Sequence, residues 1–180
     1  AAGPDVALVT QRLAPRQAPF GSTDATRVRT ADEILSDRSS SGKKVAVLGG
    51  DSLGFEVAET LLKRGAAVAL VEPSGRLGGS IESITRKTML ERLQRDGLQV
   101  ILGATPVRLA GNGLVLSQKD GTETTLAVET VVLAQGYDRD ESLLAALQAA
   151  GVDARSLPGC EAPRWVIEAM LEGAAIARTI

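Results

Sequence analysis

The sequence contains no histidine and only one cysteine, Cys160, among its 180 residues. A single thiol cannot form an internal disulfide, a CxxC redox pair, a cysteine-ligated iron–sulfur cluster or an all-cysteine zinc site. The absence of histidine removes a common metal ligand and the usual base of nucleophile triads. We therefore expect no metal site and no catalytic acid, base or nucleophile in this chain.

Aromatic residues are also scarce, at 2%, although hydrophobic residues make up 44% of the chain and charged residues 23%. The core must therefore come from Val, Leu, Ile and Ala, which is typical of buried parallel strands and the helices that cover them. The length and these proportions indicate a globular α/β protein with a substantial core. Cys160 and the single tryptophan, Trp165, are interpreted as packing residues.

Neither sign of charge is in excess, because 20 basic and 22 acidic residues give a net charge of -2. Such a balance lacks the basic surface that nucleic acid or an anionic membrane attracts. Long apolar runs are missing as well, and the first residues lack the basic and apolar regions of a secretory signal. We expect no nucleic-acid or membrane partner, and a cytoplasmic location.

The best-organised segment has the pattern of a βαβ unit. Residues 43–48 (KKVAVL) are predicted as a strand, residues 55–64 (FEVAETLLKR) as a helix with apolar positions at helical spacing, and residues 66–71 (AAVALV) as a second strand that Glu72 closes. The glycine-rich turn GGDSLG joins the first strand to the helix. This order predicts two parallel neighbouring strands with a helix packed across them.

The remaining elements are predicted from periodicity, turn residues and helix caps. Residues 5–9 form a short apolar run, and the backbone up to Gly21 is predicted to be irregular. Further predictions are a capping box that starts a helix at Thr30, a linker at 39–42, helices at 84–96, 141–150 and 165–179, strands at 99–102 and 130–134, and a meander over 107–126. We predict an α/β fold, a Rossmann-like parallel sheet flanked by helices with a small antiparallel β-meander insertion.

The glycine-rich turn carries the clearest chemical signal. A strand that leads into a helix through glycines lets backbone N–H groups and the positive helix terminus face a pyrophosphate. In this interpretation Gly49, Gly50, Ser52 and Leu53 present backbone to the phosphates, and Gly54 allows the helix to pack closely on the strand.

Two residues beyond the second strand bear on the choice of nucleotide. Glu72 lies where an acidic side chain meets the adenosine ribose 2′-OH, which favours NAD over NADP. Arg76 argues the other way, because a nearby arginine can accommodate a 2′-phosphate. A carboxylate at a strand end is also a common solvated loop residue, so the interpretation of Glu72 depends on its place in the βαβ unit.

Asp51 stands where the G-x-G-x-x-G template has its second glycine. A carboxylate about 4 Å from a phosphate charge costs ~1 kcal/mol in bulk water and ~4 kcal/mol at an effective dielectric near 20. Alternatively, the Asp51 side chain caps the helix N-terminus and occupies the donors that a phosphate would use. Two interpretations therefore stay open, a working nucleotide pocket and a self-capped structural turn.

Three passages resemble the two-dinucleotide-domain flavoproteins of the pyridine nucleotide-disulfide oxidoreductase superfamily. Residues 43–72 resemble the inner NAD-binding segment, residues 131–136 (VVLAQG) the strand and A-x-G turn that lead back to the flavin domain, and residues 161–178 the closing helix. The E-A-P-R start of that helix is most similar to the C-terminal region of the trimethylamine dehydrogenase and 2,4-dienoyl-CoA reductase group. The resemblance adds Gly136 to the expected cofactor-binding residues.

The resemblance implies the nucleotide-binding domain of an NAD(P)H-linked flavoprotein oxidoreductase, which positions the dinucleotide for hydride transfer to or from a flavin. It implies a leading segment at 1–40, a dinucleotide-binding domain at 41–150 and a closing helix segment at 151–180. NAD(H) or ADP is the expected ligand. FAD or FMN is expected only on a flavin-bearing domain or subunit outside this chain, because Gly159 stands where the family has an aspartate facing the flavin. The isolated chain is not expected to be active alone.

Two other functions fit parts of the same pattern. A degenerate Rossmann domain would keep its fold for a structural or regulatory role and bind ADP or no nucleotide, which Asp51 and Gly159 favour. A methyltransferase that uses S-adenosylmethionine also places a glycine turn and an acidic strand end around a nucleoside. The hairpin at residues 111–113 and the E-A-P-R helix argue against the methyltransferase.

Overall fold

The computed structural model describes residues 5–10, 12–20, 25–38, 42–157 and 166–180, which divide into two compact units. One unit, here called the nucleotide unit, is Pro15–Gly136. The other, the terminal unit, combines the residues up to Ala14 with those from Tyr137 onward. The division into domains at 1–40, 41–150 and 151–180 stays a proposal.

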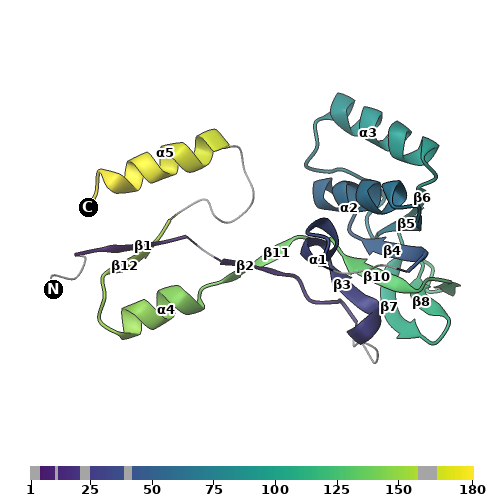
Figure 1. Ribbon diagram of the computed structural model, residues 1–180, viewed down its shortest axis with the longest axis horizontal. Coiled ribbons are helices and arrows are strands. Elements are labelled where there is room, and N and C mark those ends of the chain that lie inside the picture. The colour runs from purple at the N-terminus through teal and green to yellow at the C-terminus, as the bar shows by residue number, and fades with distance from the viewer. Residues whose placement is uncertain (1–4, 11, 21–24, 39–41, 158–165) are drawn as a thin grey trace. The chain divides into compact units, whose positions relative to one another are not determined.

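A parallel sheet forms the centre of the nucleotide unit, as predicted, and it has five strands, of which β3 was not predicted (Figure 1). The strands are short; the three central ones, β10, β4 and β5, are mostly apolar, and β4 and β10 are buried over nearly their whole length. A strand buried on both faces reads as a continuous apolar run, which is why these segments lack alternation. The strand order is β3 (Val28–Thr30), β10 (Thr130–Leu133), β4 (Lys44–Leu48), β5 (Ala67–Glu72), β6 (Gln99–Leu102).

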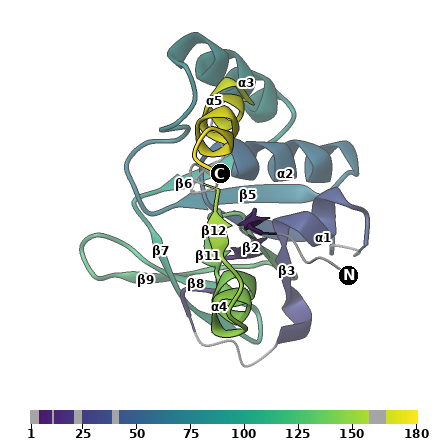
Figure 2. The same cartoon turned by 90° about the vertical axis from the view of Figure 1, so that its left-hand side faces the viewer.

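Successive side chains of these strands enter two different cores. Val45 and Val47 of β4 pack with the helices, whereas Ala46 and Leu48 pack with the meander. This division follows from the pleat, which points neighbouring residues to opposite faces. The helices are α1 (Ala31–Leu35), α2 (Ser52–Lys63) and α3 (Ser83–Arg95), and the antiparallel meander is β7 (Thr105–Ala110), β8 (Gly113–Ser117) and β9 (Glu123–Leu126). Figure 2 shows these layers on either side of β5.

Local signals placed most of these elements correctly. The capping box at the start of α1 is present, with the Thr30 side chain accepting from Glu33 N and the Glu33 side chain accepting from Thr30 N. Helix α2 begins at Ser52, earlier than the predicted start at Phe55, because Asp51 already takes the extended N-cap conformation. Glu72 belongs to β5 as its last residue, which fixes its direction more firmly than a loop would.

The terminal unit is smaller and is built from elements distant in sequence. Strand β1 (Ala7–Val9) pairs in parallel with β12 (Ala154–Ser156), and β2 (Arg12–Pro15) pairs with β11 (Tyr137–Asp140). Two helices, α4 (Ser142–Ala149) and α5 (Val166–Ala177), complete it. The prediction of irregular backbone up to Gly21 is wrong for Arg12–Pro15, because β11 supplies a partner that local sequence does not reveal.

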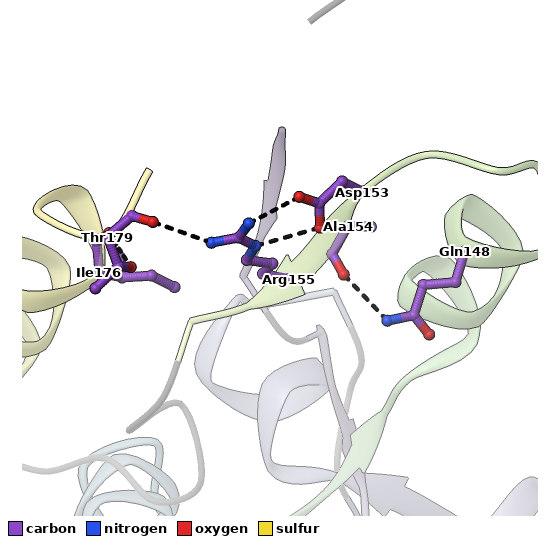
Figure 3. Close-up of polar contacts among 6 residues, drawn as sticks. All are labelled: Gln148, Asp153, Ala154, Arg155, Ile176 and Thr179. Carbon is purple, nitrogen blue, oxygen red and sulfur yellow. Dashed lines mark hydrogen bonds and ion pairs between the residues drawn. The ribbon is translucent and has the colours of Figure 1, made fainter. Parts of the chain in front are cut away.

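Arg155 joins two parts of the terminal unit (Figure 3). Its guanidinium donates to both carboxylate oxygens of Asp153, at 3.2 and 2.8 Å, and to the carbonyl oxygen of Thr179, 3.4 Å away, just beyond α5. The hydrogen bonds from Arg155 hold the pKa of the Asp153 carboxyl below its ordinary value. The amide of Gln148 on α4 donates to the carbonyl oxygen of Ala154 at 3.0 Å, so both helices are tied to β12.

A cap at the start of α3 gives this part of the fold a pH dependence. The carboxylate of Glu82 accepts from the backbone N–H groups of Ile84 and Thr85 and from the hydroxyl of Ser83, and these bonds lower the pKa of Glu82 from 4.5 to about 2. A lowered folded-state pKa stabilises the protein above the unfolded pKa, and this stabilisation is lost as the pH falls toward the folded pKa. We expect resistance to urea to fall between about pH 4.5 and pH 2, and Glu82→Gln to reduce that change. A Glu91→Gln control should show the same loss of urea resistance between these pH values as the parent chain.

No helix in the described part of the chain is both long enough and apolar enough to cross a membrane.

Candidate functional site

The order in which the chain adds strands to the sheet changes side at β4. From β4 it moves through α2 to β5 and then β6 on one side, whereas β10 lies on the other side of β4. Open parallel sheets bind ligands in the crevice outside the carboxyl ends of the strands at such a switch point. The glycine-rich turn follows β4 directly, so the fold places the predicted site there.

Two glycines of this turn are required by its geometry. Gly49 has a φ of 111°, and a Cβ there would overlap the carbonyl oxygen of Ala134, which follows β10. A Cβ on Gly54 would overlap the carbonyl oxygen of Gly49 itself. The first turn of α2 can therefore approach the ends of β4 and β10 only with glycine at both positions.

The side chain of Asp51 does not cap α2, although the residue occupies the N-cap position. Its Oδ1 accepts instead from Ser80, at 2.7 Å from the hydroxyl and 3.3 Å from the backbone nitrogen. The interpretation that the Asp51 side chain caps α2 is therefore wrong. In the described part of the chain, no side chain caps the N-terminus of α2, whose N–H groups carry the positive end of the helix dipole.

Glu72 reaches back from the end of β5 to the glycine-rich turn. Its Oε2 accepts from the backbone N–H of Gly50 at 2.8 Å, and its Oε1 accepts from that of Ser74 at 2.9 Å. Both carboxylate oxygens thus have a backbone partner, and the side chain is partly buried rather than fully solvated. The structure brings together Gly50, in the turn after the first strand of the βαβ unit, and Glu72, the last residue of its second strand.

The other predicted site residues lie around this edge of the sheet. Arg76 is exposed in the loop that follows β5, where its carbonyl oxygen accepts from the hydroxyl of Ser74 at 2.8 Å. Gly136 follows β10 with a φ of 91° and accepts from the backbone N–H of Arg16 at 3.1 Å. Ser52 and Leu53 form the first turn of α2.

Sequence reasoning missed the part played by the β5–α3 loop. The backbone N–H of Gly78 donates to the carbonyl oxygen of Gly50 at 2.7 Å, and Leu77 is buried in the core that contains α2. Ser80, two residues further on, holds Asp51. The only local signal was the pair of glycines at 78 and 79, which marks a turn without indicating what the turn contacts.

A cavity of about 400 Å³ opens beside this site at the same edge of the sheet. The loops after β5 and β6 and the β8–β9 turn line it, and Gly103 N joins two of these loops by donating to the carbonyl oxygens of Glu72 and Ser74, at 2.8 and 3.2 Å. Its volume is within the range of small-molecule pockets. A second cavity of about 510 Å³, lined in part by Arg27 and Lys44, lies by the start of β4.

Several sequence-based interpretations fall outside the described residues. Gly159, Cys160 and Trp165 are among them, so the flavin argument and the two packing interpretations stay predictions. Among the described residues, no group of three or more cysteine, aspartate or glutamate side chains could hold a metal ion.

Comparison with known proteins identifies the family of this fold. A family model described as pyridine nucleotide-disulphide oxidoreductase matches residues 14–158. An NADH oxidase from Thermoanaerobacter brockii is 27% identical over 155 residues, which cover 84% of this chain and 24% of that enzyme. A cinnamate reductase from Clostridium sporogenes is 25% identical over 144 residues, which cover 78% of this chain and 21% of that enzyme.

Solved structures share the fold at lower identity. A 2-naphthoyl-CoA reductase in complex with 2-naphthoyl-CoA superposes with a TM-score of 0.83 at 22% identity, covering 98% of this chain and 27% of that one. Histamine dehydrogenase from Rhizobium sp. 4-9 gives a TM-score of 0.80 at 18% identity, covering 98% and 30%. The chain therefore spans about a quarter of the length of these relatives.

Proposed function

The chain belongs to the pyridine nucleotide-disulphide oxidoreductase family, and from this premise we propose that it holds NAD(H) for a flavin carried elsewhere. Bound there, the nicotinamide supplies or accepts a hydride, and the role of this chain is to orient it. No residue of the chain is assigned as an acid, base or nucleophile. The observation that most supports this proposal is the hydrogen bond from the backbone N–H of Gly50 to Glu72 Oε2, 2.8 Å long, at the switch point of the sheet.

The residues present fit a dinucleotide pyrophosphate. The N-terminus of α2 has no side-chain cap in the described structure, and glycines at 49 and 54 keep side-chain atoms out of the turn. Backbone N–H groups of Ser52 and Leu53 then face the phosphates together with the helix dipole. Neutral backbone donors hold the two phosphate charges without the long side chains that a surface site would need.

Glu72 is proposed to hold the adenosine ribose. A carboxylate at the end of the second strand accepts hydrogen bonds from ribose hydroxyls, and its negative charge opposes a 2′-phosphate. The cavity lined by Gly75, Leu102 and Gly103 lies next to it and offers room for the adenine. Exposed Arg76 is proposed to lie at the rim of the same subsite, near the ribose.

A flavin-bearing domain or subunit is the proposed partner. The terminal unit exposes large apolar side chains on α4 and α5, including Leu143 (58%), Ile167 (62%) and Met170 (66%). On α5, Ile167, Met170 and the exposed Leu171 (65%) share one face at helical spacing, and such a group of apolar side chains favours association with another protein surface. The relatives are roughly four times as long as this chain, so a partner surface within the same enzyme accounts for these side chains.

One observation favours a second function, a degenerate domain with a structural or regulatory role. Asp51 introduces a carboxylate where the nucleotide-binding template has glycine, and a phosphate would meet that charge. Such a domain would keep the sheet, α2 and the partner surface while binding ADP or no nucleotide.

Calorimetric titration of the 180-residue chain with NADH, NADPH and ADP separates these functions. We expect NADH to bind at least about tenfold more tightly than NADPH, because a carboxylate near a 2′-phosphate costs more than 1.4 kcal/mol at an effective dielectric near 20. ADP should compete with NADH. Absence of NADH binding, with or without binding of ADP, would support the degenerate domain. Equal affinity for NADH and NADPH would exclude the role given to Glu72.

A further inference from the structure

Asp51 and Ser80 together decide where a negative charge lies beside the glycine-rich turn. We propose that Ser80 is a positioning residue that holds the Asp51 carboxylate away from the N-terminus of α2, and thereby keeps the turn open to a pyrophosphate. The inference rests on the proposed nucleotide-binding function and adds a residue that determines its affinity. It explains how this chain can carry an aspartate at a position of close phosphate approach.

An aspartate at an N-cap position ordinarily bonds to the helix. Asp51 has the extended backbone of an N-cap residue, with φ −104° and ψ −167°, so its side chain is within reach of the N–H groups of the first turn. The bonds that it makes are to Ser80, through the hydroxyl at 2.7 Å and the backbone nitrogen at 3.3 Å. Both donors come from one residue and reach the same carboxylate oxygen, Oδ1, and the Asp51 side chain makes no hydrogen bond to the helix.

The position of Ser80 is fixed by buried contacts on the same loop. Leu77 is 5% exposed and packs over Gly50, where a Cβ would overlap its Cδ2 atom. Gly78 donates to the carbonyl oxygen of Gly50 at 2.7 Å, and its own carbonyl accepts from Arg86 of α3 at 3.4 Å. The loop is therefore anchored to the turn before it reaches Ser80, so the serine hydroxyl and N–H are in place to donate to the Asp51 carboxylate.

The electrostatic consequence concerns the phosphate rather than the fold. Without the Ser80 hydroxyl, the Asp51 carboxylate is free to cap α2, where it would occupy N–H donors and repel the pyrophosphate. With Ser80 in place, those donors remain uncapped and the negative charge is shifted toward the β5–α3 loop. Ser80 thus acts on the nucleotide through Asp51.

The test is a double-mutant cycle on the 180-residue chain, with the NADH dissociation constant measured by calorimetry. We expect Ser80→Ala to weaken NADH binding by about tenfold. In an Asp51→Gly background, the same substitution should change affinity by less than about twofold, because the interaction it removes is already absent. Ser80→Thr, which keeps a hydroxyl, should restore affinity, and Ser83→Ala, whose hydroxyl bonds to Glu82, should leave it unchanged.

Amide NMR shifts of the nucleotide-free chain give a second readout. Ser80→Ala should shift the amides of Leu53 and Gly54, the usual partners of an N-cap side chain, as the carboxylate moves onto the helix terminus, and this shift should vanish with Asp51→Gly. Unchanged NADH affinity in Ser80→Ala, with binding intact in the parent chain, would overturn the inference alone. A parent chain that binds NADH only after Asp51→Gly would also overturn it, whereas failure of both chains to bind would remove the proposed function as well.

Discussion

A Gly54→Ala variant is expected to lose at least about 2 kcal/mol of unfolding free energy, although alanine is the better helix former by about 1 kcal/mol. The added Cβ overlaps the backbone carbonyl oxygen of Gly49, which cannot move aside without disturbing the end of β4. Backbone offers no rotamer through which the clash could relax. Overpacking of this kind outweighs helix propensity.

The measurement is thermal unfolding followed by circular dichroism. For a chain of this length, a loss of about 2 kcal/mol lowers Tm by about 4–8 °C. Gly75→Ala is the matched control, because no atom lies within 4 Å of a Cβ at that position, and it should change stability by less than about 0.5 kcal/mol. Equal Tm values for the two variants would contradict the close approach of α2 to the turn.

Replacing Glu72 by alanine should weaken NADH binding by about 10- to 100-fold. The variant removes the acceptor for Gly50 N at 2.8 Å and for Ser74 N at 2.9 Å, and it removes the proposed ribose ligand. Gly50 is buried, and an unsatisfied buried N–H costs about 1–3 kcal/mol, while a hydrogen bond to a charged group contributes about 1.5–3 kcal/mol. Stability and affinity should therefore both decrease.

Glu72→Gln separates the two effects of that substitution. Glutamine keeps the size of the side chain and one oxygen acceptor but loses the charge. The ratio of NADH to NADPH affinity should therefore fall toward one, whereas Tm should fall less than it does in Glu72→Ala. Titrations with NADH and NADPH, paired with thermal unfolding, measure both quantities. Glu91→Ala on α3, whose exposed side chain lies 4.0 Å from Lys87, serves as the control. Unchanged NADH affinity in Glu72→Ala would remove Glu72 from the site.

Local sequence predicted the nucleotide unit well because its signals are strong over short distances. The capping box at Thr30, the apolar runs of β4, β5 and β10, and the glycines that end helices each depend on neighbouring residues. The meander followed from its turn residues, including the Gly111-Asn112 turn between β7 and β8. These are interactions within one turn of helix or one hairpin, so no tertiary information is needed to infer them.

The terminal unit was predicted less well for the opposite reason. Strands β2 and β12 consist of three or four residues whose partners lie more than a hundred positions away in the sequence. Such short segments carry no periodicity that distinguishes them from loops. Only the pairing of distant segments makes them strands.

The sequence by itself determined the βαβ unit, the glycine-rich turn and the acidic end of β5, because these depend on residue type and spacing. The tertiary structure decided what those residues contact. Two carboxylates that could each have bonded elsewhere were assigned to different partners, Glu72 to the N–H groups of Gly50 and Ser74, and Asp51 to Ser80. The path of the β5–α3 loop determines these partners, because buried Leu77 anchors the loop so that Ser80 lies beside Asp51. No local sequence pattern encodes how a loop folds back over a turn.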